Sequence, residues 1–164
     1  MDNYNLDPFL LREIEDLNIT PLPRNFPSSW HFYSMMKQFN VDEPNKLPSF
    51  MSPGSQESMI PGTIEPKKGD VVLEKSFASI FLGTNFEFML RNRAITTIIF
   101  TGIATEMVIE SSVRDASNRG FYPVVISDCV SSMDREAHER SLKNMVRLSI
   151  VKDAGTILKT FDNS

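Results

Sequence analysis

Three stretches of the sequence combine residue types that could do chemistry. Lys75 follows the short apolar run Val71–Leu73 and precedes a mostly apolar stretch. We expect its ammonium to lie among apolar groups, where desolvation lowers the pKa of a lysine and a nearby carboxylate would restore its charge. The second stretch is Thr101–Glu106, and the third ends in Cys129, the single cysteine of the chain. All three stretches follow short apolar runs that could be strands, and ligands gather beyond the carboxyl ends of parallel strands.

The chemistry of Thr101–Glu106 would come from its backbone. Gly102 stands where a strand would turn directly into a helix. The first N–H groups of such a helix have no partner within the helix and can hold a developing oxyanion. A plainer interpretation is an ordinary turn in which Thr105 caps the helix. Lys75 likewise has a plainer interpretation, as an ion-paired or snorkelling lysine, so the residues alone leave both questions open.

The second half of the chain has the pattern of alternating strands and helices that would bring these stretches together. Apolar runs spaced by about 25 residues predict strands, and the segments between them predict helices. The expected strands are Val71–Leu73, Thr96–Phe100, Tyr122–Ile126 and Ser149–Val151, and the expected helices are Thr84–Asn92 with a capping box, Thr105–Arg119 and Met133–Leu148. Strands that are apolar on both faces are typical of a parallel sheet. The carboxyl ends of such strands meet at one edge, so we expect one crevice there.

The first part of the chain has a different composition. Nine of its ten prolines lie at or before Pro66, and residues 1–70 hold 6 Lys/Arg against 10 Asp/Glu. Frequent proline argues against central strands. We therefore predict loops and short helices over residues 1–68, with helices at Asp7–Leu17 and Trp30–Phe39. An α/β core follows over residues 69–164, within one structural domain overall.

Overall composition excludes several classes of protein. The chain has 164 residues, a net charge of −4 and one cysteine. An acidic chain lacks the basic surface that tracks a phosphate backbone, so no nucleic-acid partner is expected. A lone thiol, no basic and apolar leader and no long apolar run predict a cytoplasmic protein with no membrane partner.

The motifs in this half of the chain resemble those of the isochorismatase-like hydrolases, also called the cysteine hydrolase superfamily. They are Lys75, Ser79–Phe81, Gly83–Thr84, Phe100–Thr105, Glu110–Ser112, Arg114–Ala116, Gly120–Tyr122, Ser127–Cys129 and Glu136–His138. Their order and spacing agree from about Ser52 to Phe161. The sequence is most similar to the ureidoacrylate-type amidohydrolases of that family.

The resemblance implies a three-layer αβα sandwich with a mostly parallel, Rossmann-like sheet. It also implies an Asp–Lys–Cys site that cleaves small amides or carbamoyl groups, without a cofactor. Lys75 would be the catalytic lysine. Ile103, Ala104 and Thr105 would belong to an oxyanion loop with a cis peptide bond between Ile103 and Ala104. Val108 and Phe81 would lie near the substrate.

Two departures from the family pattern fall on the catalytic set. Val108 occupies the position of the nucleophilic cysteine, and no apolar run ending in aspartate precedes Lys75. Possible substitutes are few. Cys129 is an alternative nucleophile, Ser111 and Ser112 are expected to point away from the mouth of the site, and Glu74 and Glu106 are expected to be solvated or capping side chains.

The sequence therefore supports two hypotheses about function. One is a hydrolase of a small amide, carbamoyl or vinyl-ether compound that uses Lys75 and backbone N–H groups near Ala104 and Val108. The other is a degenerate relative that binds a small molecule or assembles with other copies. Both predict a homodimer or higher homo-oligomer. His31 and His138 are far apart in sequence, so no metal site is expected.

Overall fold

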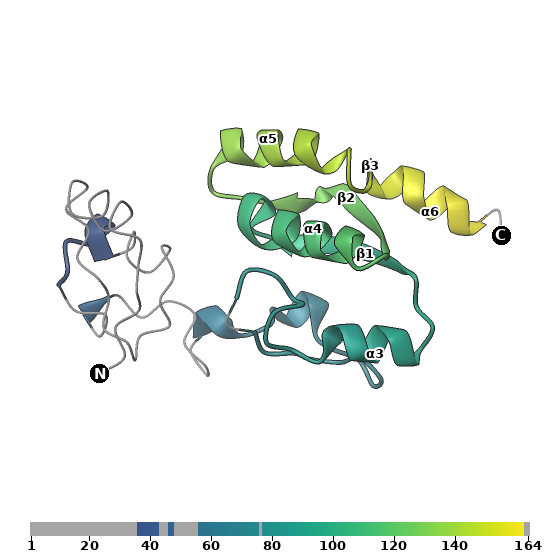
Figure 1. Cartoon of the computed structure of the whole chain (residues 1–164), viewed down its shortest axis with the longest axis horizontal. Helices are drawn as coiled ribbons and strands as arrows, with labels where there is room; N and C mark the ends of the chain where they lie inside the picture. Colours follow the sequence, from purple (N-terminus) through teal and green to yellow (C-terminus); the bar gives the residue numbers. More distant parts are fainter. Residues whose placement is uncertain (1–35, 43–45, 48–55, 76, 163–164) are drawn as a thin grey trace, which may run out of the picture. The chain divides into compact units, whose positions relative to one another are not determined.

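The structure is a computed structural model that describes residues 36–42, 46–47, 56–75 and 77–162 (Figure 1). The chain divides into two compact units, Met1–Glu65 and Pro66–Ser164. In the first unit the described residues form a helical turn at 36–38 and the 3-10 helices η2 (Gln56–Ser58) and η3 (Gly62–Ile64). The helix predicted over Asp7–Leu17 lies outside the described residues, as does most of Trp30–Phe39.

The second unit is built on a parallel sheet in the order β1-β2-β3. Its strands are β1 (Thr97–Ile103), β2 (Tyr122–Ser131) and β3 (Ile150–Lys152). Ile99 pairs with Val124, which pairs with Ile150, so these three form one row across the sheet. The sheet confirms the parallel arrangement predicted from the apolar runs.

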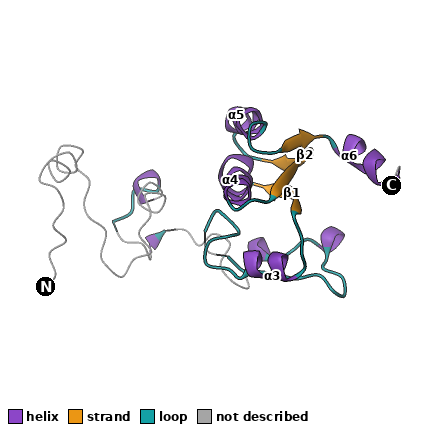
Figure 2. Cartoon of the chain, turned by 45° about the vertical axis from the view of Figure 1, so that its right-hand side comes forward, coloured by secondary structure: helices purple, strands orange, loops and turns teal. Residues whose placement is uncertain are grey.

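Helices cover both faces of this sheet. The π-helix η4 (Thr105–Ile109) continues into α4 (Glu110–Asn118), which lies beside α5 (Arg135–Met145) on one face (Figure 2). The helix α6 (Ala154–Asp162) lies on the other face, so the three-layer αβα architecture is confirmed. The sequence did not predict α6. Gly120 ends the α4 segment with φ +80°, as expected of a glycine after a helix.

Residues 71–73 do not form the predicted first strand. They have no regular secondary structure, and Val71 and Val72 are exposed. An isolated strand has no partner for its backbone groups, and three apolar residues bury too little surface to fix one. The prediction of a strand ending at Lys75 was therefore wrong.

The helix predicted from Thr84 is present as α3 (Phe86–Asn92), without the predicted capping box. Thr84 Oγ1 accepts a hydrogen bond from the Phe86 N–H at 3.2 Å and donates to the Ile80 carbonyl. Glu87 does not reach back to the helix start, because its carboxylate pairs with the guanidinium groups of Arg91 and Arg119. Glu87 lies in the first turn of α3 as expected, but its partners are arginine side chains and not the backbone at the helix start.

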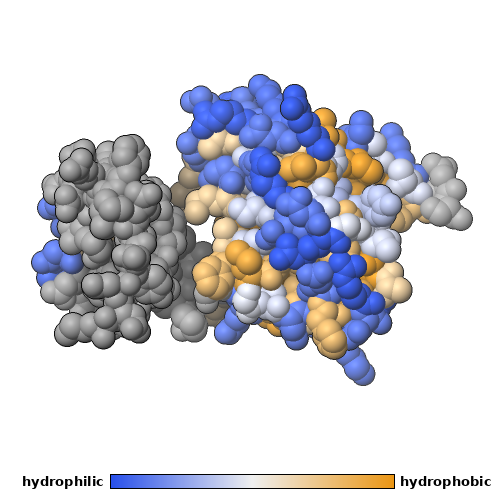
Figure 3. All heavy atoms as spheres, in the orientation of Figure 1, coloured by the Kyte–Doolittle hydropathy of each residue, from blue (hydrophilic) through white to orange (hydrophobic). Residues whose placement is uncertain are grey.

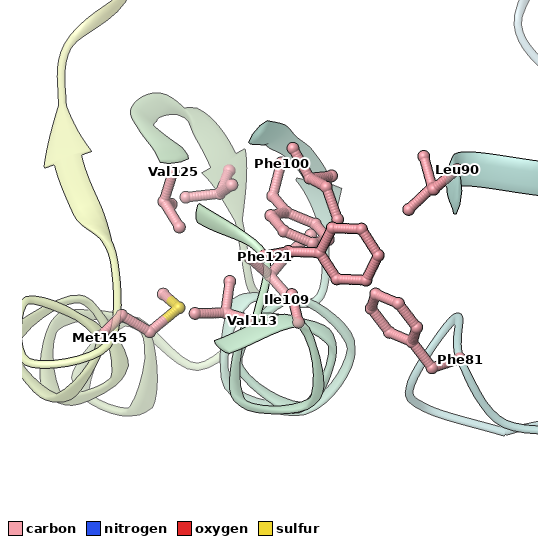
Figure 4. Packing of buried hydrophobic residues seen from close by; sticks show 11 residues of the cluster. Phe81, Leu90, Phe100, Ile109, Val113, Phe121, Val125 and Met145 are labelled. Carbon is pink, nitrogen blue, oxygen red and sulfur yellow. The ribbon is translucent and has the colours of Figure 1, made fainter. Parts of the chain in front are cut away.

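One apolar cluster joins the sheet to α4, α5 and the segment before β1. Val113, Ala116, Val125 and Met145 are completely buried in it. In Figure 4 Val113 lies between the side chains of Met145 and Ile109. Phe81 packs edge-on against Phe86, with ring centroids 5.3 Å apart. This packing fixes the elements that surround the candidate site.

Candidate functional site

A cavity of about 240 Å³ lies where the segment after Lys75 meets β1 and η4. Four consecutive residues of β1 line it. Because side chains alternate between the two faces of a strand, four consecutive residues can line one cavity only where it reaches around the edge of the strand. The cavity therefore lies along the edge of β1 that does not pair with β2. Its lining residues are Lys75, Ile80, Phe86, Ile98, Ile99, Phe100, Thr101, Val108, Ile109 and Ser112.

Lys75 contributes the charge to this cavity. Its Nζ donates hydrogen bonds to the carbonyls of Phe77 at 2.8 Å and Ala78 at 3.2 Å. Lys75 is exposed, and partial desolvation lowers its pKa below the ordinary lysine range. Within the described part of the chain no carboxylate forms an ion pair with this ammonium. The pKa shifts in the predicted direction, but Lys75 lies exposed in a loop and not among apolar groups at a strand end.

Val108 lines the same cavity from η4. Its N–H donates to the Ala104 carbonyl at 2.8 Å, and the Ile109 N–H donates to that same carbonyl at 3.1 Å. The Ile103–Ala104 peptide bond is cis, as the resemblance implied. Val108 is the position where the resemblance places the nucleophile. A valine side chain has no nucleophilic atom, so this position offers only an apolar surface to the cavity.

His138 on α5 holds the start of η4, a role that the sequence did not indicate. Thr105 is completely buried, and its Oγ1 forms a 2.8 Å hydrogen bond with Nδ1 of His138 on α5. A second link joins Ser141 on α5 to Glu110 at the start of α4. His138 is half-buried. The place of His138 in the motif Glu136–His138 was the only sequence signal for its contact with Thr105.

Ser112 contradicts the expectation that its hydroxyl points away from the site. It lies one helical turn after Val108 on the same face and lines the cavity. Its Oγ donates to the Val108 carbonyl at 2.7 Å and accepts from the Ile80 N–H at 3.2 Å. These two bonds hold η4 against the segment after Lys75, and they leave the hydroxyl poorly suited to act as a nucleophile.

Other candidate residues lie outside the cavity lining. Phe81 is buried in the core, where the guanidinium carbon of Arg119 lies 5.1 Å from its ring centroid. Ile103 is exposed. Cys129 is exposed, with its Sγ 4.0 Å from Oδ1 of Asp128. Ser111 is also absent from the lining. The structure therefore places Lys75 and Val108 in one cavity lining, to which neither Phe81 nor Cys129 belongs.

The two candidate carboxylates do not line the cavity either. Glu74 is exposed, as expected. Glu106 is half-buried, and its Oε2 has neither solvent contact nor a hydrogen-bond partner within the described part of the chain. It does not cap η4 through its side chain. The expectation of a solvated or capping Glu106 was therefore wrong.

The described ranges contain no cluster of three or more His, Cys, Asp or Glu side chains that could hold a metal ion. None of their helices has the length and apolar character needed to cross a membrane. The cavity thus offers one ammonium and apolar walls, which is the chemistry of binding an anion or stabilising negative charge.

Comparison with known proteins identifies relatives of this chain. An ureidoacrylate amidohydrolase of Methylorubrum extorquens is 31% identical over 118 residues, which are 71% of this chain and 47% of the relative. A nicotinamidase/pyrazinamidase of Bacillus subtilis superposes with a TM-score of 0.62 at 26% identity, covering 68% of this chain and 66% of that one. An isochorismatase family protein of Desulfovibrio vulgaris superposes with a TM-score of 0.70 at 17% identity, covering 94% and 81%.

These matches differ in how much of each protein they cover. The chain spans about half the length of the curated relatives it matches. The sequence model of the Isochorismatase domain matches residues 14–156, which is most of the chain. Fold, motif order and this match agree, and the chain therefore belongs to the isochorismatase family.

Proposed function

We propose that this chain hydrolyses a small amide, carbamoyl or vinyl-ether compound in the cavity beside Lys75. The observation that carries the proposal is that Lys75 and Val108, distant in sequence, line one cavity, and that the Val108 N–H donates to the carbonyl of Ala104, the residue after the cis bond. Relatives named as an ureidoacrylate amidohydrolase and a nicotinamidase/pyrazinamidase support amide chemistry. The proposal concerns a small molecule, because the cavity holds about 240 Å³.

Lys75 has the main part in this reaction. With an amide or carbamoyl substrate, its ammonium stabilises the negative charge that develops on the carbonyl oxygen when water attacks. Backbone N–H groups near Ala104 and Val108 are the proposed oxyanion donors. The Val108 N–H is paired with the Ala104 carbonyl, so a substrate oxygen would have to share that donor. Thr105 holds the end of this loop through its hydrogen bond with His138.

Val108 also sets a limit on the chemistry. A cysteine at this position would form a covalent acyl intermediate, whereas valine cannot. The described lining residues include no carboxylate or thiol. Hydrolysis in this cavity would therefore use water directly, and we expect slow turnover.

A second candidate function is favoured by the same residue. With Val108 in place of a nucleophile, the cavity would bind a small molecule without converting it. The fold would then serve as a binding or oligomerising scaffold. The two candidates share the cavity and differ in turnover.

One set of measurements separates them. Purified full chain is assayed against a panel of amides, carbamoyl compounds and enol ethers. The hydrolase predicts turnover above the buffer rate that Lys75→Ala lowers and that Lys152→Ala, a change of an exposed lysine on β3, leaves unchanged. No turnover by the unmodified chain and no effect of Lys75→Ala would refute it.

The variant Val108→Cys tests whether the rest of the site survives. If the new thiol reacts with a labelling reagent and amidase activity appears with it, the unmodified chain is a binding scaffold that lacks only the nucleophile. A labelled but inert variant would show that another group is missing as well. The cytoplasmic location and the homo-oligomer expected from the sequence stay predictions.

A further inference from the structure

The helix α6 carries more apolar surface than the sheet covers. Its apolar residues recur at the spacing that gathers side chains on one face of a helix, at Ala154, Ile157, Leu158 and Phe161. Ala154 and Ile157 are half-buried, whereas Leu158 and Phe161 expose 61% and 62% of their surface. A helix of nine residues is marginal in water without packing, and no residue of α6 is buried. Its apolar face therefore has room for a further partner.

The strands present exposed apolar side chains on the same side. Val125 packs into the cluster with α4 and α5, so the adjacent Val124 projects from the opposite face, which carries α6. Ile99 and Ile150 pair with Val124 and project from that face with it. Tyr122, two residues before Val124, does so as well. Val124 is buried there, whereas Ile99, Tyr122 and Ile150 are exposed.

These exposed residues of the strands and of α6 form what we call the α6 patch. Its members, which expose between 47% and 68% of their surface, are Ile99, Tyr122, Ile150, Leu158 and Phe161. With about 200 Å² for a large apolar residue, the exposed surface is on the order of 600 Å². A stable interface buries about 800 Å² per partner, of which about 65% is apolar in homodimers. The patch therefore has as much apolar surface as one half of a homodimer interface needs.

The charges beside the patch favour a second copy of this chain as its partner. Residues 152–162 carry two basic and two acidic side chains, Lys152, Lys159, Asp153 and Asp162. A patch bordered by charges of one sign would repel its own copy, whereas a balanced border does not. In a two-fold dimer the same patch occurs on both subunits, so an apolar surface meets an apolar surface.

We propose that the α6 patch is the interface of a two-fold symmetric dimer of this chain. The apolar side chains of the patch on one copy pack against those of the other, which removes them from water. Ile99 also lines the cavity beside Lys75, so this interface borders the candidate site. The inference concerns assembly and holds whether or not the cavity turns over a substrate.

The oligomeric state of the full chain tests this proposal. Sedimentation equilibrium at micromolar concentrations should approach twice the mass of the chain. Phe161→Gln replaces an apolar ring by a polar side chain that suits a helix, and it should raise the dissociation constant of the dimer at least about 10-fold. Circular dichroism verifies that the variant keeps its fold.

Two further variants show whether the whole patch is involved. Tyr122→Thr removes the ring from β2 without a change in α6, and it should also raise the dissociation constant at least about 10-fold. This effect would not arise if Phe161→Gln acted only by unfolding α6. Phe88→Gln is the matched control, because Phe88 lies on α3 and is as exposed as Phe161. It should leave the dissociation constant within about 2-fold.

Several results would overturn the inference. A chain that stays monomeric up to high micromolar concentration would do so, since the patch would then have another partner or none. An oligomer that neither Phe161→Gln nor Tyr122→Thr weakens would place the interface on another surface. An equal effect of Phe88→Gln would mean that loss of any exposed ring weakens association. Mass is the only quantity measured, so absence of hydrolysis leaves this test unaffected.

Discussion

The hydrogen bond between Thr105 and His138 gives a prediction that can be worked out from the structure. Thr105→Val removes the hydroxyl and keeps the shape of the side chain. Thr105 is completely buried, so the new methyl group is accommodated without loss of apolar contact. The lost bond is the 2.8 Å contact with His138 Nδ1.

The expected magnitude follows from what the change leaves behind. A typical hydrogen bond contributes about 0.5–1.5 kcal/mol, and a buried partner left unsatisfied costs about 1–3 kcal/mol. His138 is half-buried, so its ring nitrogen can partly regain water. We therefore expect Thr105→Val to lower the free energy of unfolding by about 1 kcal/mol, which corresponds to a fall of about 2–4 °C in Tm for a chain of this size.

A double-mutant cycle assigns this energy to the pair. Thr105→Val, His138→Leu and the double variant are unfolded in urea, and the coupling between the two positions should be about 1 kcal/mol. Thr97→Val changes an exposed threonine of β1 and should alter stability by less than about 0.5 kcal/mol.

Either of two results would refute the reasoning. A coupling below about 0.3 kcal/mol would mean that the bond does not stabilise the start of η4. A Thr97→Val effect as large as that of Thr105→Val would mean that loss of a threonine hydroxyl, and not this contact, lowers stability.

Three further predictions concern the charge, a helix start and the open part of the sheet. Turnover in the cavity should fall as pH rises through the pKa of Lys75, because the neutral amine does not stabilise a developing negative charge; the lowered pKa starts that fall below the ordinary lysine range, and initial rates at several pH values measure it. No other titratable side chain lines the cavity among the described residues, so a fall that persists unchanged in Lys75→Ala would contradict this assignment. Asp134→Ala removes the carboxylate that accepts the Ala137 N–H at 2.9 Å and should cost about 1 kcal/mol in urea unfolding, while an unchanged midpoint would show that the cap does not matter. Ile99→Lys places a charge on an exposed apolar position of β1 and should weaken self-association in sedimentation experiments, and a variant that stays as oligomeric as the unmodified chain would exclude this face from the interface.

The last of these predictions depends on a part of the sheet that the described residues leave open. Ile99 and Ile150 belong to one row across the sheet, and both are exposed, as is Tyr122. On the face shown in Figure 3, apolar patches alternate with hydrophilic ones. Contact with another copy would remove such apolar surface from water, which supports the expected homo-oligomer.

The errors of the sequence analysis have distinct physical causes. Residues 71–73 are a β-like run, but whether a strand forms depends on a partner, which local sequence does not reveal. The capping box of Thr84 failed because Arg119, distant in sequence, competes for Glu87. The prediction that Ser112 points away from the site was wrong because the cavity extends from η4 one helical turn further, into α4.

The sequence alone determined the three paired strands and the helices between them, because continuous apolar runs and helix signals are local properties, although it gave no sign of α6. It also indicated the family and, through the resemblance, the cis Ile103–Ala104 bond, because these depend on motif and position. Only the tertiary structure decided that Lys75 has no described carboxylate partner, that Ser112 closes one wall of its cavity, and that His138 holds Thr105. These contacts join residues far apart in the chain, and whether they form depends on how the helices pack on the sheet.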